Sequence, residues 1–167
     1  KHIAVWFSCG AASAVAAKLT LEKYGSTNKV SIINNPIKEE HEDNQRFLKD
    51  VEKWLGHPIE FATRSKYPSQ SCEEVWEARR FMSGIAGAPC TLELKKKARQ
   101  EWENTHNPDY TVLGFTAEEG HRADRFRLTE RDTLLTPLID VNYDKQACFD
   151  VLFNAGIELP AIYKLGY

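Results

Sequence analysis

The sequence shows no strong excess of charge, no long apolar run and few cysteines, and each absence excludes a class of protein. Its 22 basic and 24 acidic side chains leave a net charge of −2, so charge alone gives no general attraction to nucleic acid or to an anionic membrane surface. No apolar run approaches the length that spans a bilayer, and no signal-peptide pattern opens the chain, so we expect a cytoplasmic protein with no membrane partner. The four cysteines lie far apart in 167 residues, which argues against a disulfide-stabilised scaffold.

A chain of 167 residues fits a single domain with a sizeable core. The sequence contains no internal repeat, low-complexity segment or domain linker. Short apolar segments alternate with segments of helical periodicity, which predicts an α/β domain with a mostly parallel twisted sheet and helices on both faces. The expected strands are 3–7, 29–34, 59–62, 111–115 and 134–138, and the expected helices are 12–24, 43–55, 72–81, 92–105 and 145–155.

Polar residues follow the ends of four predicted strands. These segments are 8–13, 34–35, 64–66 and 114–125. In open parallel sheets, ligands bind outside the carboxyl ends of the strands, at the point where the strand order reverses. The polar segments are therefore the candidates for a binding site.

Segment 8–13, with the sequence Ser-Cys-Gly-Ala-Ala-Ser, joins an apolar strand to an alanine-rich helix. The first N–H groups of a helix have no helical partner and carry the positive end of the dipole, so small residues here let a phosphate approach them. The hydroxyls of Ser8 and Ser13 could add hydrogen bonds. The segment is not a Walker A loop and lacks the three glycines of a dinucleotide-binding turn. It predicts a phosphate-binding turn, and an ordinary strand-to-helix turn with serine as N-cap fits the local sequence equally well.

Amide and carboxylate side chains follow the second predicted strand. Asn34 and Asn35 could hydrogen-bond a ribose or the edge of an adenine base. The acidic residues after them have a simpler interpretation, because Asp43 and Asn44 are good N-caps and residues 39–42 are typical of a solvated loop. We favour capping for most of this segment.

Cys90 and Thr91 stand at the start of the helix predicted at 92–105, which carries Lys95, Lys96 and Lys97. A helix N-terminus near lysines lowers the pKa of a thiol and attracts anions. Cys90 therefore has three interpretations: a metal or cluster ligand, a nucleophilic thiolate, or a small buried side chain. The lysines have two interpretations, an anion-binding cluster or a solvated helix face, because a run of charges is typical of both.

Gly114 opens a segment that places Arg122, Arg125 and Arg127 after the fourth predicted strand. Arginine holds phosphate or sulfate oxygens with two parallel hydrogen bonds. Three acidic residues within the segment could pair with the arginines instead, so a salt-bridged surface helix is the alternative. We favour ligand contact because the segment follows a strand end.

Taken together, four segments in order along the chain resemble the phosphoadenosine-phosphosulfate (PAPS) reductase family, within the adenine-nucleotide alpha-hydrolase or PP-loop superfamily. Segment 8–13 is similar to the pyrophosphate-binding motif Ser-Gly-Gly-x-Asp-Ser of that superfamily. Cys90-Thr91 with Leu94-Lys95 resembles the family's mid-chain cysteine segment, and Gly114 with Arg122 and Arg125 resembles its Gly-x-Arg stretch. The last third resembles the family's Pro-Leu-x-Asp to Tyr-x-x-Gly-Tyr ending, here Pro137-Leu138-Ile139-Asp140, Asp144, Leu152, Gly156, Pro160 and Tyr163-Lys164-Leu165-Gly166-Tyr167.

The resemblance implies an enzyme of sulfur metabolism, an oxidoreductase or sulfur transferase that binds ATP, adenosine phosphosulfate or PAPS through the PP-loop. It implies Cys90 and Arg122 as catalytic residues. The nucleotide-binding residues that it implies are Ser8, Cys9, Gly10, Ala11, Ser13, Asn34, Lys95, Gly114, Arg122 and Arg125.

The resemblance also implies partners and cofactors. Mg²⁺ and a thiol reductant or sulfur-donor protein would accompany the nucleotide, and an oligomer is compatible with the family. Cys90 would be a ligand of a [4Fe–4S] cluster, with further cysteines in a short tail that we expect beyond Tyr167. A nucleic-acid partner has no direct support in the sequence.

Two positions depart from the PP-loop motif. Cys9 stands where the superfamily has glycine, and Ala12 stands where it has aspartate. Loss of the carboxylate argues against metal-assisted attack at an ATP α-phosphate, whereas phosphate binding through backbone N–H groups would remain. Two other functions stay open: an ATP-dependent adenylating enzyme for thiolation of a nucleic acid or small molecule, and a non-catalytic nucleotide-binding protein.

Overall fold

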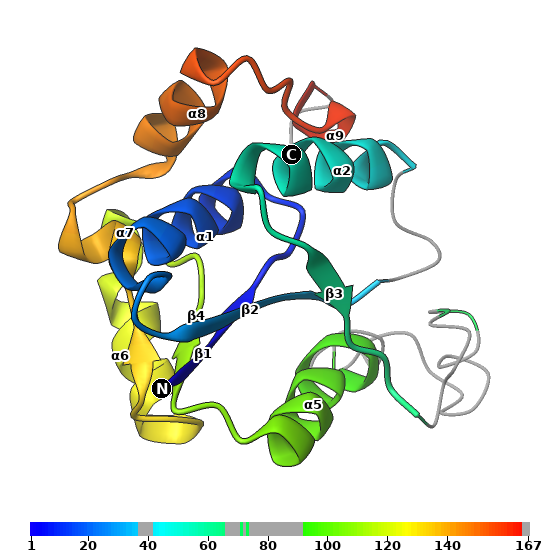
Figure 1. The fold of residues 1–167 in the computed structure, drawn as a ribbon, viewed down its shortest axis with the longest axis vertical. Coiled ribbons are helices and arrows are strands. Elements are labelled where there is room, and N and C mark those ends of the chain that lie inside the picture. The colour runs from blue at the N-terminus through cyan, green and yellow to red at the C-terminus, as the bar shows by residue number, and fades with distance from the viewer. Residues whose placement is uncertain (37–41, 66–70, 72, 74–91, 165–167) are drawn as a thin grey trace. The chain divides into compact units, whose positions relative to one another are not determined.

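The computed structural model describes residues 1–36, 42–65, 71, 73 and 92–164, and its strands form one sheet. The strands are β1 (His2–Trp6), β2 (Lys29–Asn34), β3 (Ile59–Phe61), β4 (Tyr110–Val112) and β5 (Leu134–Leu135). Their order across the sheet is β3-β2-β1-β4-β5, and Figure 1 labels β1 to β4. β1 runs parallel to β2 and to β4, with Val5 opposite Ile32 on one side and Val112 on the other. The predicted α/β class with a parallel sheet is confirmed.

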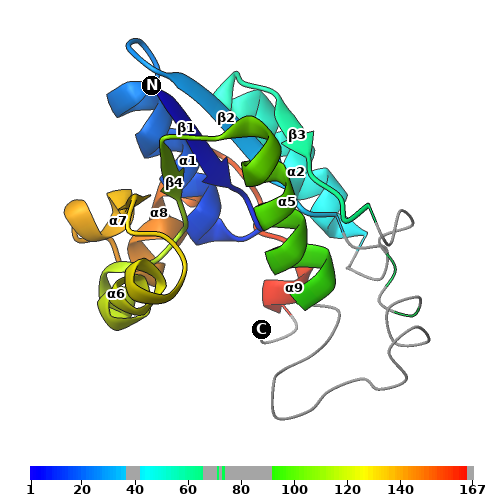
Figure 2. The same ribbon diagram turned by 90° about the horizontal axis from the view of Figure 1, so that it is seen from below.

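Helices connect and flank these strands. In the described part of the chain the α-helices are α1 (Ala11–Tyr24), α2 (Asp43–Leu55), α5 (Ala98–His106), α6 (Gly120–Thr129), α7 (Pro137–Asp140), α8 (Lys145–Asn154) and α9 (Ala161–Lys164). A π-helical turn, η1 (Leu92–Lys97), precedes α5, and a 3₁₀ turn, η2 (Ala117–Glu119), precedes α6. α1 packs against α2, α7 and α8 (Figure 1), and α6 lies beside α7 (Figure 2). No helix in the described ranges is long and apolar enough to cross a membrane.

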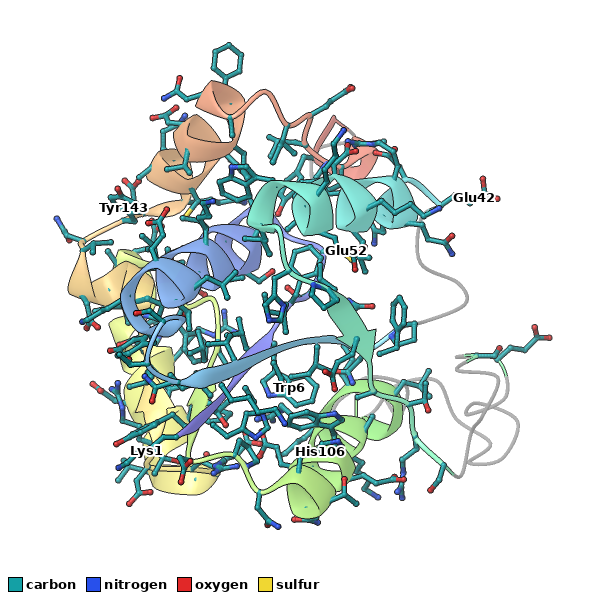
Figure 3. The ribbon with its side chains drawn as sticks, viewed as in Figure 1. Lys1, Trp6, Glu42, Glu52, His106 and Tyr143 are labelled. Atoms are coloured by element: carbon teal, nitrogen blue, oxygen red, sulfur yellow. The ribbon has the colours of Figure 1, made fainter. Side chains whose placement is uncertain are left out.

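The centre of the sheet is buried on both faces, as the apolar sequence of β1 predicts. Ile3, Val5 and Phe7 are at most 2% exposed, and Trp6, labelled in Figure 3, is also buried. A strand of a parallel sheet is covered on both faces, so its sequence is a nearly continuous apolar run. The alanines of α1 belong to the same apolar cluster. This packing fixes the end of β1 and the start of α1 relative to each other.

The described residues divide into two compact units. The first comprises the described residues of 1–33, 41–60 and 108–167, and the second those of 34–40 and 61–107. Within the first unit, Glu52 of α2 (Figure 3) accepts a hydrogen bond from the backbone N of Ile59 at 2.8 Å and so joins α2 to the start of β3. This division into units does not test the expectation of a single domain, which stays a prediction.

Two predicted strands end three residues earlier than the sequence pattern indicated. The expected strand 111–115 ends at Val112, because Leu113 and Phe115 leave the sheet and pack with Phe126 of α6. The expected strand 134–138 ends at Leu135, because Pro137 is the first residue of α7. Proline is well suited to that position, since its missing N–H has no helical acceptor there.

The predicted helices also need corrections. The helix expected at 92–105 opens as the π-helical turn η1 before it becomes α5. Asp43 is the first residue of α2 rather than its N-cap, and its carboxylate pairs with Arg46. α7 and α9 were not predicted, and α6 was considered only as the alternative of a salt-bridged surface helix. The helix expected at 72–81 lies outside the described residues, apart from Glu73.

Candidate functional site

The strand order reverses beside β1. After β1 the chain adds β2 and β3 on one side, and it then returns to add β4 and β5 on the other side. This reversal places the switch point of the sheet between the carboxyl ends of β1 and β4, where parallel sheets bind ligands. Segment 8–13 follows β1 and Gly114 follows β4. Both of these predicted segments therefore lie at the switch point.

Gly114 lies directly against the start of α1. A Cβ atom on this residue would stand 2.8 Å from the backbone nitrogen of Ser13 and 2.9 Å from its Cα. A side chain does not fit at that distance from backbone atoms, so glycine lets the two loops meet. The structure thus brings together two predicted binding segments that are far apart in the sequence.

The turn after β1 contains a residue in the left-handed region. Cys9 has a φ of 60° and is buried. This conformation favours glycine, which the PP-loop motif has at this position, and it costs other residues about 1–2 kcal/mol. Gly10 follows with extended backbone, and α1 begins at Ala11. The backbone makes a turn suited to glycine, with cysteine in its place.

The hydroxyl of Ser13 holds the turn closed. It accepts a hydrogen bond from the backbone N of Ser8 at 3.1 Å and donates to the carbonyl oxygen of Gly10 at 3.1 Å. The hydroxyl of Ser8 lies 3.2 Å from that of Ser13. Ser13 is buried, whereas Ser8 is exposed. Of the two serines, Ser8 is therefore the one that presents its hydroxyl to solvent.

The first turn of α1 supplies backbone donors to the same place. The amides of Ala11, Ala12 and Ser13 lie too early in the helix to reach a helical acceptor. The first turn also contains no acidic residue. The positive end of the helix dipole is therefore not neutralised within its own first turn.

Tyr163 of α9 reaches this helix N-terminus. The amide of Ala11 donates to the phenol oxygen of Tyr163 at 3.1 Å. The ring of Tyr163 packs edge-on against that of Phe149, with 5.4 Å between the ring centres, and Nζ of Lys145 lies 5.8 Å from the centre of the Tyr163 ring. The sequence pointed to Tyr163 only through the C-terminal motif, and its contact with the turn comes from the tertiary structure.

The segment that leads into α9 is fixed to α2. Arg46 donates to the carbonyl oxygens of Glu158 at 2.9 Å and of Leu159 at 3.1 Å. Asp43, which pairs with Arg46 at 2.8 Å, accepts a hydrogen bond from the amide of Ala161 at 2.7 Å. These two charged residues of α2 hold the start of α9, a role that no sequence pattern indicated for either of them.

A capping box holds the segment before α6. The carboxylate of Glu119 accepts hydrogen bonds from the backbone N of Thr116 at 3.1 Å and from its hydroxyl at 3.0 Å, and it pairs with Arg122. Burial alone would raise the pKa of Glu119, but the hydrogen bonds from Thr116 and the charge of Arg122 outweigh burial and hold that pKa below its ordinary value of 4.5. The Thr-x-x-Glu signature of such a box is legible in the sequence, within a segment where a strand was expected to end.

The two arginines that were predicted to bind phosphate lie on the exposed surface of α6. The side chain of Arg122 is 60% exposed, pairs with Glu119, and has its guanidinium 5.5 Å from the centre of the Phe115 ring. Arg125 is also exposed. Among the described residues, no hydrogen bond or ion pair joins either arginine to segment 8–13. Their observed geometry is that of a salt-bridged surface helix, and phosphate binding by them stays a prediction.

Three further predicted residues lie elsewhere. Asn34 is buried at the end of β2, and its carbonyl oxygen accepts a hydrogen bond from the amide of Ala62 at 2.9 Å. Lys95 is half-buried in the π-helical turn η1, a feature that is frequent at functional sites. Both belong to the second unit. Cys90, the predicted catalytic residue and cluster ligand, lies outside the described residues.

The described residues do not by themselves fit a metal centre. No group of three His, Cys, Asp or Glu side chains in this part of the chain is arranged to hold a metal ion. Burial, helped by the charges of Asp144 and Glu118, raises the pKa of the Cys148 thiol to about 11. Since the thiolate is the reactive form, Cys148 is a poor ligand and nucleophile near neutral pH. An iron–sulfur cluster would need about four thiolates, so we derive no step through one.

The fold is similar to those of two solved enzymes. PAPS reductase from Candida auris, in a phosphate complex, has a TM-score of 0.66 and 11% identity, covering 99% of this chain and 78% of that one. The U34-tRNA thiolase NcsA from Methanococcus maripaludis, with its [4Fe–4S] cluster, has a TM-score of 0.60 and 13% identity, covering 95% of this chain and 57% of that one. The chain therefore has a PAPS reductase-like fold. At these identities the likeness shows the fold alone. No protein-family model matches the sequence, and no curated protein matches it either.

Proposed function

We propose that this chain binds an adenine nucleotide at the switch point of its sheet, with the phosphates in the turn of segment 8–13, and acts on it in sulfur chemistry. The reaction would be that of a sulfonucleotide reductase or sulfur transferase. Its substrate would be PAPS, adenosine phosphosulfate or ATP. The fold shared with PAPS reductase supports this class of substrate.

The observation that carries the proposal is the construction of the turn. It combines a buried residue at a φ of 60°, a 14-residue helix that begins two residues later, and the close approach of Gly114 after the neighbouring strand. Helix N-termini bind phosphate through their backbone N–H groups. An ordinary strand-to-helix turn needs neither the left-handed residue nor the second loop.

The backbone and the side chains would have different tasks at this site. The first amides of α1 and the hydroxyl of Ser8 would bind phosphate oxygens. Arg122 and Arg125 would neutralise further phosphate or sulfate oxygens, and Arg122 would exchange the carboxylate of Glu119 for the nucleotide. Such contacts stabilise charge that develops on a leaving group. The family resemblance further implies Asn34 at the ribose or base, Lys95 at a phosphate and Cys90 as the redox-active thiol or cluster ligand.

Calorimetric titration with ATP, adenosine phosphosulfate and PAPS in parallel, with Mg²⁺ present, tests the proposal. We expect binding of a sulfated nucleotide in preference to ATP. Preference for ATP would move the assignment to an adenylating enzyme. Binding of none of the three would overturn the proposal and leave the fold.

Two valine variants make the titration specific to the turn. Gly10 has a φ of −110° and a ψ of 162°, a backbone that valine tolerates, and the new side chain would enter the turn, where its Cβ would stand 3.2 Å from the Tyr163 hydroxyl. Gly10→Val should therefore abolish nucleotide binding in a folded protein. Gly120→Val is the matched control, because a Cβ at Gly120 meets no atom within 4 Å. Normal binding by Gly10→Val would contradict phosphate binding in this turn.

An ATP-dependent thiolation enzyme is the second candidate, and the similarity to the U34-tRNA thiolase favours it. Ala12, in place of the motif's aspartate, argues against it, because adenylation uses metal-assisted attack on the α-phosphate. Release of AMP and pyrophosphate from ATP in the presence of tRNA would identify this function. Intact ATP under those conditions would exclude it.

A further inference from the structure

The phenol oxygen of Tyr163 lies at the start of α1, where it takes a backbone donor. Its phenol oxygen accepts the hydrogen bond of the Ala11 amide at 3.1 Å, and it lies 3.2 Å from the position of a Cβ on Gly10. The backbone of each residue carries a single N–H donor. A phosphate oxygen and the Tyr163 oxygen therefore compete for the Ala11 amide.

Tyr163 is held through its ring and through the backbone at the start of α9. The ring packs against Phe149, and Lys145 lies over it. The backbone before α9 is bound by Arg46, and the first residue of α9 by Asp43. A side chain anchored in this way occupies the turn as part of the folded protein.

We propose that Tyr163 is a gate on the phosphate-binding turn. In the closed state its hydroxyl holds the Ala11 amide, and in the open state a phosphate oxygen takes that amide while Tyr163 moves aside. This inference rests on the proposed function. A nucleotide that binds only the open state has its affinity reduced in proportion to the closed fraction. Removal of the hydroxyl should therefore strengthen binding, which is the reverse of what removal of a phosphate ligand does.

Tyr163→Phe tests the gate, because it keeps the ring and removes only the oxygen. A single hydrogen bond contributes a net 0.5–1.5 kcal/mol, so we expect nucleotide binding to become roughly 2- to 10-fold tighter. Tyr24→Phe is the matched control, since Tyr24 ends α1 at the opposite end from the turn, and its affinity should not change. Both variants are titrated with ATP, adenosine phosphosulfate and PAPS beside the parent protein.

The outcomes separate the gate from the proposed function. Equal or weaker binding by Tyr163→Phe, with the parent still binding, overturns the gate and leaves the nucleotide site in place. Failure of parent and variant alike to bind any of the three nucleotides overturns the proposed function, and the gate with it.

Hydrogen exchange of the Ala11 amide in the ligand-free proteins is a second test of the gate, and it needs no nucleotide. We expect at least twofold faster exchange in Tyr163→Phe than in the parent or in Tyr24→Phe. Unchanged exchange would show that the hydroxyl does not hold this amide, and it would overturn the gate.

Discussion

The turn after β1 and the arginine segment after β4 follow neighbouring strands, yet they hold their polar groups in different ways. In the turn, the donors are backbone amides, fixed by α1 and by the hydrogen bonds of Ser13. In the arginine segment, the donors are long side chains on an exposed helix, and Arg122 already pairs with Glu119. Backbone amides at a helix start have no competing helical acceptor, whereas an arginine beside a carboxylate must first leave it. One amide of the turn already donates to Tyr163, but that acceptor is neutral, so the turn is the better prepared of the two for an anion.

The largest expected effect comes from breaking the contact between these two regions. Gly114→Val would place its side chain against the backbone of Ser13, so it should lower the free energy of unfolding by about 3 kcal/mol, the upper end for overpacking. Nucleotide binding should be lost with it. Urea denaturation measures the change. Gly120→Val, the control in open space, should stay within about 0.5 kcal/mol of the parent because valine and glycine differ little in helix propensity. A Gly114→Val protein as stable as the control would contradict the close approach.

A somewhat smaller effect is expected within the turn itself. Cys9→Val puts a β-branched side chain at a φ of 60° and should cost roughly 2 kcal/mol of stability. Cys9→Gly relieves the backbone strain but loses a buried side chain, so its net change should stay within about 1 kcal/mol. Thermal unfolding of the pair gives the difference. Equal stability of the two variants would show that the turn does not need a left-handed residue.

A variant in the arginine segment should affect binding more than stability. Arg122→Ala removes an exposed ion pair, so the free energy of unfolding should change by less than about 0.5 kcal/mol. Nucleotide affinity should fall by more than about 1 kcal/mol, because hydrogen bonds to charged groups contribute about 1.5–3 kcal/mol. Denaturation and calorimetry on the same preparation separate the two effects. Unchanged affinity would remove Arg122 from the proposed site.

The smallest expected effect is the pH dependence of the capping box. Because the folded state holds the pKa of Glu119 below 4.5, its carboxylate stabilises the fold above that pH, and this contribution is lost as the pH falls below it. Glu119→Gln keeps an acceptor for Thr116 and removes the charge. Its unfolding free energy should be lower than that of the parent near pH 7 and should decline less steeply between neutral and acid pH. Parallel curves of unfolding free energy against pH for the two proteins would show that the charge of Glu119 adds nothing to stability.

Local sequence patterns predicted the bounds of a helix or strand well where its own residues mark both of its ends. β2 and α2 have the predicted bounds, since an apolar run and a helical stripe with Gly56 after it mark them clearly. The pattern failed after β4, because Leu113 and Phe115 continue an apolar run but pack against α6 instead of joining the sheet. Apolar residues alone do not show which element will bury them.

The sequence by itself determined the parallel sheet and the strand-turn-helix around segment 8–13. The apolar run of β1 and the small residues after it favour these conformations through interactions between residues close together in the chain. Only the tertiary structure decided what surrounds that turn. Gly114 reaches it through the strand order, and Tyr163 reaches it through the anchoring of α9 to α2. Both contacts join residues far apart in the chain. No local pattern encodes such contacts, since they depend on the order of the strands and on the packing of helices from different parts of the sequence.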